Sequence, residues 1–136
     1  MTEKEILEKV NRRSPFNSYN GIRVTRIGPG EGEAAAELGP ESMNAWGYVH
    51  GGLLFSLCDV AGGAAASGGT RGCVTLSGNI YFLRPASGKT LTASARAVKL
   101  GKNVAVVRVD VLDDGGETVS GGEFEYYYTG GEYADK

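Results

Sequence analysis

The central segment of the chain, residues 44–69, reads NAWGYVHGGLLFSLCDVAGGAAASGG. Its apolar residues recur at helical spacing, which predicts a helix from about Gly51 to Ala66, ended by Ser67-Gly68-Gly69. One apolar stripe of this helix is suited to the concave face of a sheet and consists of Leu54, Leu57, Cys58, Ala61 and Ala65. A single carboxylate, Asp59, interrupts the apolar run. Burying a carboxylate is costly unless it is paired, so the position of Asp59 in this helix needs an explanation.

Outside this helix the pattern changes to that of β-strands. Residues 22–27 and 33–38 flank the turn Gly28-Pro29-Gly30 and predict a hairpin. Four longer segments are rich in Val, Thr, Tyr and Ala and cover residues 74–83, 91–100, 104–112 and 118–128. Short connections between long strands favour an antiparallel meander. The sequence therefore predicts an α+β fold in which a curved antiparallel sheet of five to six strands wraps around one long central helix.

The ends of the chain add one short helix and no second domain. Thr2 and Glu5 have the spacing of a capping box and precede apolar residues at helical spacing, so residues 1–13 are expected to form a short amphipathic helix. A chain of 136 residues fits one domain, and we expect residues 1–136 to form it. Its uncharged stretches contain too much Gly, Ser and Ala to span a bilayer, and its first residues lack the apolar core of a secretory signal. We therefore expect a cytoplasmic protein with no membrane segment.

Charge is distributed unevenly along a chain whose net charge is −2. Between Asp59 and Asp110 there is no acid but seven cations, namely Arg71, Arg84, Lys89, Arg96, Lys99, Lys102 and Arg108. This segment carries +7, which leaves −9 on the remainder. The cations are either solvent-facing residues of one sheet or a positive rim for an anionic ligand such as a phosphate-bearing cofactor. Nucleic acid is not expected as the partner, because basic and aromatic residues do not alternate.

No metal site is expected. Cys58 and Cys73 lack metal-ligand spacing, and the one histidine, His50, cannot complete a familiar zinc site with them. The two cysteines are therefore interpreted as free, buried thiols.

Glycines near the central helix suggest uses for its polar groups. Gly51 and Gly52 precede the apolar run, where N–H groups without an intrahelical acceptor and the positive end of the helix dipole form a potential oxyanion hole. Asp59 shares a stripe with Gly62 and Gly63, whose small size would let another backbone approach, such as the same helix of a second chain. The alternatives are that Asp59 is a hydrogen-bonded structural residue or a polar interface contact, and that His50 and Asn44 stabilise local structure.

The spacing of Gly51 and Asp59 predicts a dimer. Eight helical residues separate them, which is about 12 Å at 1.5 Å per residue, too far for both to act on one reacting group. If two copies of the helix lie antiparallel across a two-fold axis, Gly51 of one chain faces Asp59 of the other. We therefore expect an obligate homodimer with two composite sites.

The same residues resemble a known signature. Residues 44–52, Asn44-Ala45-Trp46-Gly47-Tyr48-Val49-His50-Gly51-Gly52, followed by Asp59, are similar to the N-x-x-G-x-x-H-G-G…D signature of acyl-CoA thioesterases of the phenylacetate-degradation type, within the 4-hydroxybenzoyl-CoA thioesterase superfamily. The similarity continues through residues 79–86 and 99–102 and covers roughly residues 15–128. It implies the hotdog fold and hydrolysis of an aryl or a short- to medium-chain acyl-CoA to the free acid and CoA.

The resemblance also implies roles for individual residues. Gly51 would polarise the thioester carbonyl through its backbone N–H, and Asp59 of the opposite subunit would act as general base or as nucleophile. Asn44 and His50 would orient the substrate or the attacking water, and the Thr75 hydroxyl would lie near the same water. The residues alone do not decide between base and nucleophile for Asp59.

Binding residues and assembly are carried over in the same way. Gly52 is a further candidate for substrate binding, and Arg84, Lys99 and Lys102 are candidates for contacts with the CoA phosphates. The resemblance implies a homotetramer built from two dimers, with no metal and no cofactor beyond the CoA of the substrate.

Two other functions stay open at this point. A hydratase or dehydratase acting on acyl thioesters would pair a histidine with an acid, whereas His50 lies at the start of the helix. A non-catalytic acyl-CoA-binding protein would use the same groove only to bind. As a sensor it would ordinarily carry a DNA-binding segment, which the N-terminal helix does not resemble.

Overall fold

The computed structural model describes residues 1–132 and contains one long helix and six strands. In chain order the elements are α1 (Glu3–Arg12), α2 (Pro15–Tyr19), β1 (Ile22–Gly28), β2 (Glu31–Glu37), a 3₁₀ turn (Pro40–Ser42), α3 (Gly51–Ser67), β3 (Arg71–Phe82), β4 (Thr90–Leu100), β5 (Val104–Leu112) and β6 (Thr118–Glu132). The predicted central helix is confirmed, and its C-cap is Gly68, whose φ of +59° ends it in the left-handed region. The short helix α2 and the 3₁₀ turn were not expected from the sequence.

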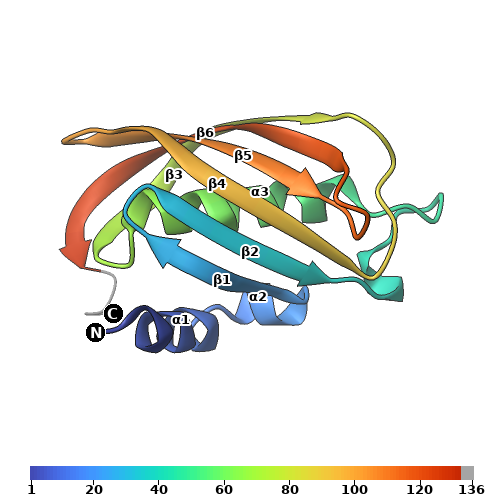
Figure 1. Ribbon diagram of the computed structural model, residues 1–136, viewed down its shortest axis with the longest axis horizontal. Helices are drawn as coiled ribbons and strands as arrows, with labels where there is room; N and C mark the ends of the chain where they lie inside the picture. Colours follow the sequence, from blue (N-terminus) through green and yellow to red (C-terminus); the bar gives the residue numbers. More distant parts are fainter. Residues whose placement is uncertain (133–136) are drawn as a thin grey trace.

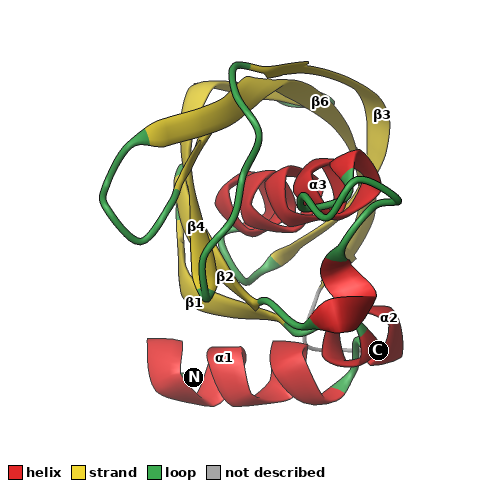
Figure 2. Cartoon of the chain, turned by 90° about the vertical axis from the view of Figure 1, so that its right-hand side faces the viewer, coloured by secondary structure: helices red, strands yellow, loops and turns green. Residues whose placement is uncertain are grey.

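The six strands form one antiparallel sheet in the order β1-β2-β4-β5-β6-β3. Figure 1 shows this sheet curving over α3, and the view along the helix in Figure 2 shows the strands surrounding it on three sides. The expected α+β architecture, with a curved sheet wrapped around one long helix, is confirmed.

The expected meander is wrong for one strand. β4, β5 and β6 are sequential neighbours, but β3 pairs with β6 and forms an edge of the sheet. The connection over residues 83–89 therefore passes across the end of the curved sheet before β4 begins (Figure 1). The short length of the connection suggested that β3 and β4 pair as a hairpin. The connection instead crosses the open end of the curved sheet and joins two strands that are not neighbours.

Small residues let α3 lie close to the sheet. Ala34 and Ala36 of β2 are fully buried against the helix. At Gly32 a Cβ atom would lie 2.7 Å from the Ala65 backbone nitrogen and 2.9 Å from the Ala64 side chain. The close approach of backbone to backbone therefore depends on glycine at this position.

Alternation along β5 separates the core from solvent. Ala105, Val107, Val109 and Val111 are all buried, whereas Arg108 and Asp110 are exposed on the opposite face. This confirms the expected core face of the strand.

The N-terminal helices lie along β1, an edge strand of the sheet (Figure 2), where Val10 of α1 packs with Val24 of β1 and Ala64 of α3. α1 begins with the expected capping box, in which the Thr2 side chain accepts from the Glu5 N–H and the Glu5 side chain accepts from the Thr2 N–H. The side chain of Asn11 holds α1 to β1 by donating to the Val24 carbonyl and accepting from the Val24 N–H. Within residues 1–132, no helix is long and apolar enough to cross a membrane.

Candidate active site

The N-terminus of α3 leaves one backbone donor available. His50 is the N-cap, and its Nδ1 accepts a hydrogen bond of 2.8 Å from the Gly52 N–H. Among residues 1–132, the Gly51 N–H makes no hydrogen bond. Of the two glycines, Gly51 is therefore the one whose N–H can meet a ligand oxygen, while His50 stabilises the helix start.

The loop before α3 is shaped by Asn44. Its side-chain oxygen accepts from the backbone N–H groups of Trp46, at 2.9 Å, and Tyr48, at 3.1 Å. Gly47 completes the turn with a φ of +83°, which a residue with a side chain rarely adopts. The turn-stabilising alternative for Asn44 is thus observed, and it fixes the approach to Gly51.

The carboxylate of Asp59 is held by two hydroxyl groups from the sheet. Its Oδ1 accepts from Thr75 Oγ1 of β3 at 2.7 Å and from the Tyr126 hydroxyl of β6 at 3.1 Å. The Tyr126 hydroxyl also lies 3.0 Å from the Asp59 carbonyl oxygen. The structure therefore brings Thr75 to Asp59 within one chain and adds Tyr126, which was not singled out in the sequence.

Asp59 and Gly51 line different cavities. Asp59 lies in the wall of a cavity of about 200 Å³ that is shared with Thr75 and Tyr126 and is otherwise largely apolar; its other lining residues include Val10, Val24, Ile27, Val60, Ala64 and Val74. Gly51 lines a second cavity, of about 350 Å³, with Asn44, Tyr48 and Phe82. The chain carries a carboxylate and a free N–H as two separate halves, in agreement with the distance of about 12 Å between them.

The small residues beside Asp59 have a different use from the expected one. We interpreted Gly62 and Gly63 as space for another backbone, but Gly62 is buried against the Tyr126 side chain of the same chain. A Cβ at Gly62 would overlap the Tyr126 hydroxyl and lie 3.1 Å from its Cζ. Gly62 therefore gives no support to a helix pair, whereas Gly63 is partly exposed and lines the Asp59 cavity.

Both cysteines are free, but only Cys58 is fully buried. Cys73 is half-buried and lines the Asp59 cavity, which corrects the expectation of two buried thiols. Burial, followed by the nearby Asp110 and Asp59 charges, raises the pKa of Cys58 to about 12. Burial and then the Asp59 charge raise the pKa of Cys73 to about 11. Both thiols are therefore protonated near neutral pH and are poor nucleophiles.

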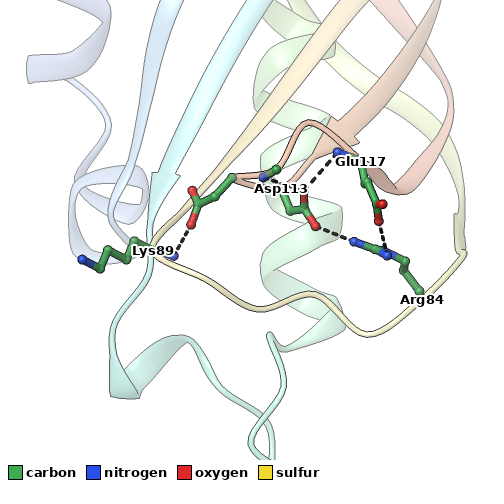
Figure 3. Close-up of polar contacts among 6 residues, drawn as sticks. Arg84, Lys89, Asp113 and Glu117 are labelled. Carbon is green, nitrogen blue, oxygen red and sulfur yellow. Dashed lines mark hydrogen bonds and ion pairs between the residues drawn. The ribbon is translucent and has the colours of Figure 1, made fainter.

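The three cations considered for CoA phosphates lie in different places. Arg84 lines the Gly51 cavity, but its guanidinium is bound by Asp113, at 2.5 Å, and by Glu117 (Figure 3). Lys99 is exposed near the end of β4, and Lys102 lies in the following turn, beyond the C-terminal end of α3. One chain does not gather them into a single phosphate site.

Comparison with known proteins adds the family. The profile of the Thioesterase superfamily matches residues 47–120. The acyl-coenzyme A thioesterase PaaI of Escherichia coli is 31% identical over 101 residues, which cover 74% of this chain and 72% of that protein. A medium/long-chain acyl-CoA thioesterase of Salmonella typhimurium is 27% identical over 120 residues, covering 74% of this chain and 76% of its own.

Solved structures agree with these matches. The E. coli PaaI protein from the phenylacetic acid degradation operon has a TM-score of 0.88 at 24% identity, covering 96% of this chain and 95% of its own. A hypothetical thioesterase from Streptococcus pneumoniae, solved with coenzyme A, has a TM-score of 0.81 at 25% identity, covering 90% and 97%. The fold implied by the signature, the hotdog fold, is confirmed. Because the family profile spans more than half of the chain and includes both Gly51 and Asp59, the chain belongs to the thioesterase superfamily.

Proposed function

We propose that the protein hydrolyses the thioester bond of an acyl-CoA and releases the free acid and CoA. The observation that carries this proposal is the Asp59 carboxylate, held by two hydroxyls in the wall of a largely apolar cavity. The same helix offers the Gly51 N–H at its N-terminus, with no acceptor within residues 1–132. A carboxylate and a preorganised N–H are the groups that acyl transfer to water needs.

The reaction then follows from these two groups. Asp59 takes a proton from a water molecule while the water oxygen attacks the thioester carbon, and the oxyanion that forms accepts from the Gly51 N–H. Such a donor stabilises the transition state by about 2.7 to 4 kcal/mol. The C–S bond then breaks, and the sulfur of CoA leaves and takes up a proton. In the alternative route, Asp59 attacks the carbonyl itself, and water hydrolyses the resulting anhydride.

We propose that the active site is shared between two chains. Two antiparallel copies of α3 would bring Gly51 of one protomer to Asp59 of the other, and the midpoint of this span is Phe55. This aromatic side chain is 37% exposed on a helix that is otherwise mostly buried. β3 is an edge strand and exposes Val74 and Leu76, which favours its coverage by a second chain. A homotetramer of two such dimers, suggested by the sequence signature, is part of the proposal.

The lining of the Asp59 cavity supports our proposal for the acyl group. A volume of about 200 Å³ lined by Val, Ile and Ala side chains suits an aryl or a short- to medium-chain group.

Gly52, Lys99 and Lys102 are our candidates for CoA contacts, and His50 and Asn44 position the loop that leads to Gly51. The proposed reaction uses no metal and no resident cofactor, and we place it in the cytoplasm.

A kinetic panel tests the function. Purified protein is mixed with aryl, short-chain and medium-chain acyl-CoAs, and free CoA is measured with a thiol reagent. We expect Asp59→Asn to lower kcat by about 10²- to 10⁴-fold with little change in KM, because the amide cannot accept the proton. Absence of Asp59-dependent CoA release from every substrate would refute the proposal. Tight binding of acyl-CoA without release would instead favour a non-catalytic binding protein.

The hydratase alternative loses support from the observed role of His50. Its Nδ1 is occupied by the Gly52 N–H, and the side chain caps α3 on the surface, away from the Asp59 cavity. Single turnover in ¹⁸O-water tests the nucleophilic route, because ¹⁸O enters the protein only if Asp59 forms the anhydride and water then attacks the aspartyl carbon of that anhydride.

A further inference from the structure

Tyr126 is a buried phenol that reaches from the sheet to the helix carrying Asp59. It lies on β6 with 2% of its surface exposed, and its ring stacks with Phe124 at a centroid distance of 6.5 Å. Only its hydroxyl approaches polar atoms, namely Oδ1 and the carbonyl oxygen of Asp59. The rest of the side chain is packed in the core, so the position of the hydroxyl is fixed by packing.

The helix contains a glycine where the hydroxyl arrives. At Gly62, one turn after Asp59, any Cβ would overlap the Tyr126 hydroxyl and lie 3.3 Å from its Cε2. Glycine inside a helix costs roughly 0.5–1 kcal/mol relative to alanine. The local sequence of α3 is therefore unfavourable for the helix itself but allows the contact between Tyr126 and Asp59.

The hydroxyl is a permanent donor. Burial, and then the Asp59 charge, raise the pKa of Tyr126 far above its ordinary value, so the phenol is protonated at neutral pH. A hydrogen bond from a neutral donor to a carboxylate is shorter and stronger than one between neutral groups. Both hydroxyls, from Thr75 and Tyr126, are directed to Oδ1. Among residues 1–132, no hydrogen bond is made to Oδ2.

We propose that Tyr126 is a positioning residue, which together with Thr75 anchors Oδ1 of Asp59 so that Oδ2 faces the reacting water or carbonyl. This role rests on the thioesterase function proposed above. Without the Tyr126 hydroxyl, the carboxylate keeps only the Thr75 contact and can rotate about its χ2 angle. A displaced catalytic group costs rate more than binding, because the reaction depends on alignment to within a fraction of an ångström.

The test compares Tyr126→Phe with a matched control. Tyr128→Phe also removes a buried hydroxyl that donates to α3, to the Ala66 carbonyl at 2.7 Å, but it does not touch Asp59. We expect Tyr126→Phe to lower kcat by about 10- to 100-fold with KM within about twofold of wild type. Tyr128→Phe should lower the melting temperature to a similar extent and leave kcat unchanged.

A second variant tests the same contact from the helix side. Gly62→Ala forces the Tyr126 hydroxyl away from Asp59, so we expect a comparable loss of kcat. In the double variant Gly62→Ala/Tyr126→Phe the clashing oxygen is gone, and kcat should be no lower than in Tyr126→Phe alone. Residues that act through one contact are non-additive in this way.

The outcomes separate the two proposals. Wild-type kcat in Tyr126→Phe, with activity still lost in Asp59→Asn, would overturn the positioning role and leave the thioesterase function standing. Additive losses of kcat in the double variant, or an equal loss of kcat in Tyr128→Phe, would likewise reduce Tyr126 to a structural residue. No CoA release by wild type from any acyl-CoA would overturn both.

Discussion

Cys73 shows how burial, together with a nearby charge, changes the chemistry of a thiol. Its thiol lines the same cavity as Asp59, where a thiolate would compete with water for the thioester. Burial and the Asp59 charge raise its pKa to about 11, so about one thiol in a thousand is ionised at pH 8. We expect iodoacetamide to modify Cys73 at least about 100-fold more slowly than an ordinary free thiol, with a rate that rises up to about pH 11. Peptide mass spectrometry at several pH values measures this rate, and modification at the rate of glutathione would contradict it.

From the sequence, only those candidate site residues that lie in one local signature could be predicted. Gly51 and Asp59 stand out because a helix start and a lone acid in an apolar run are visible without tertiary structure. Tyr126 does not, because it is 67 positions from Asp59 in sequence and reads as one more aromatic residue of a strand. Gly62 indicated locally that something packs closely beside Asp59. We expected a second copy of the helix there, but the neighbour is Tyr126. Arg84 was predicted to contact a CoA phosphate because its acidic partners, Asp113 and Glu117, are distant in sequence, at the turn between β5 and β6.

The packing of α3 on β2 depends on one glycine in the strand. Gly32→Ala would place a Cβ within 2.7 Å of the Ala65 nitrogen, and neither backbone can move without shifting the whole helix. We expect the free energy of unfolding to fall by about 1–3 kcal/mol, as in other overpacked cores. Gly28→Ala is the matched control, since a Cβ there has no neighbour within 4 Å. Urea unfolding at one protein concentration compares the two, and equal stability would show that the helix can move away.

The turn between β5 and β6 holds the crossing segment that follows β3. Asp113 accepts from the N–H groups of Glu117 and Gly115, each at 3.0 Å, and binds Arg84 from that segment (Figure 3). The Glu117 N–H above all, and then Arg84, lower the pKa of Asp113 below its ordinary value. A carboxyl with a lowered folded pKa stabilises the fold fully above its unfolded pKa, and this contribution is lost as the pH falls through the folded value.

Asp113→Asn tests this linkage. The amide oxygen can still accept from the backbone, but the charge that binds Arg84 is lost. We expect a lower melting temperature than wild type at pH 7, with a difference that shrinks as the pH is lowered below about 4. Thermal unfolding followed by circular dichroism over this range measures it. A constant difference at all pH values would mean that the charge of Asp113 does not contribute.

The elements themselves were largely predictable, whereas one pairing was not. Helical and alternating patterns are local, so α3 and all six strands were located from the sequence. The place of β3 beside β6 depends on contacts between residues far apart, such as Thr75 with Tyr126, which no local pattern encodes. The position of β3 matters for the proposed site because it brings the Thr75 hydroxyl to Asp59.

Considered as a whole, the molecule carries two half-sites at opposite parts of one helix. The Asp59 cavity opens between α3, β3 and the N-terminal helices, and the Gly51 cavity lies at the other end, under the crossing segment. A rigid helix cannot bring Gly51 and Asp59 of one chain together, which is why we propose that the missing half of each site comes from a second copy. In this proposal, a two-fold axis near Phe55 would complete both sites at once.

Mixed dimers test this shared site directly. Asp59→Asn removes the carboxylate, and Gly51→Pro removes the N–H while keeping the helix, because proline is tolerated at its first position. The preceding His50, at φ −63° and ψ 134°, already has the conformation that a residue before proline adopts. Each variant alone should be nearly inactive. When equal amounts are unfolded and refolded together, half of the dimers are mixed and each mixed dimer regains one intact site, so about a quarter of wild-type activity should return.

The mixed-dimer experiment can also contradict the shared site. If Gly51 and Asp59 served one site within a single chain, every chain in the mixture would lack one group, and refolding together would restore nothing. If Gly51→Pro alone kept wild-type kcat, the oxyanion would be held by a donor other than the Gly51 N–H. Wild type refolded in the same way gives the recoverable activity. Recovery of about a quarter of that value is expected only when the carboxylate and the N–H of each site come from different chains, because only then does pairing two defective copies produce one complete set of catalytic groups.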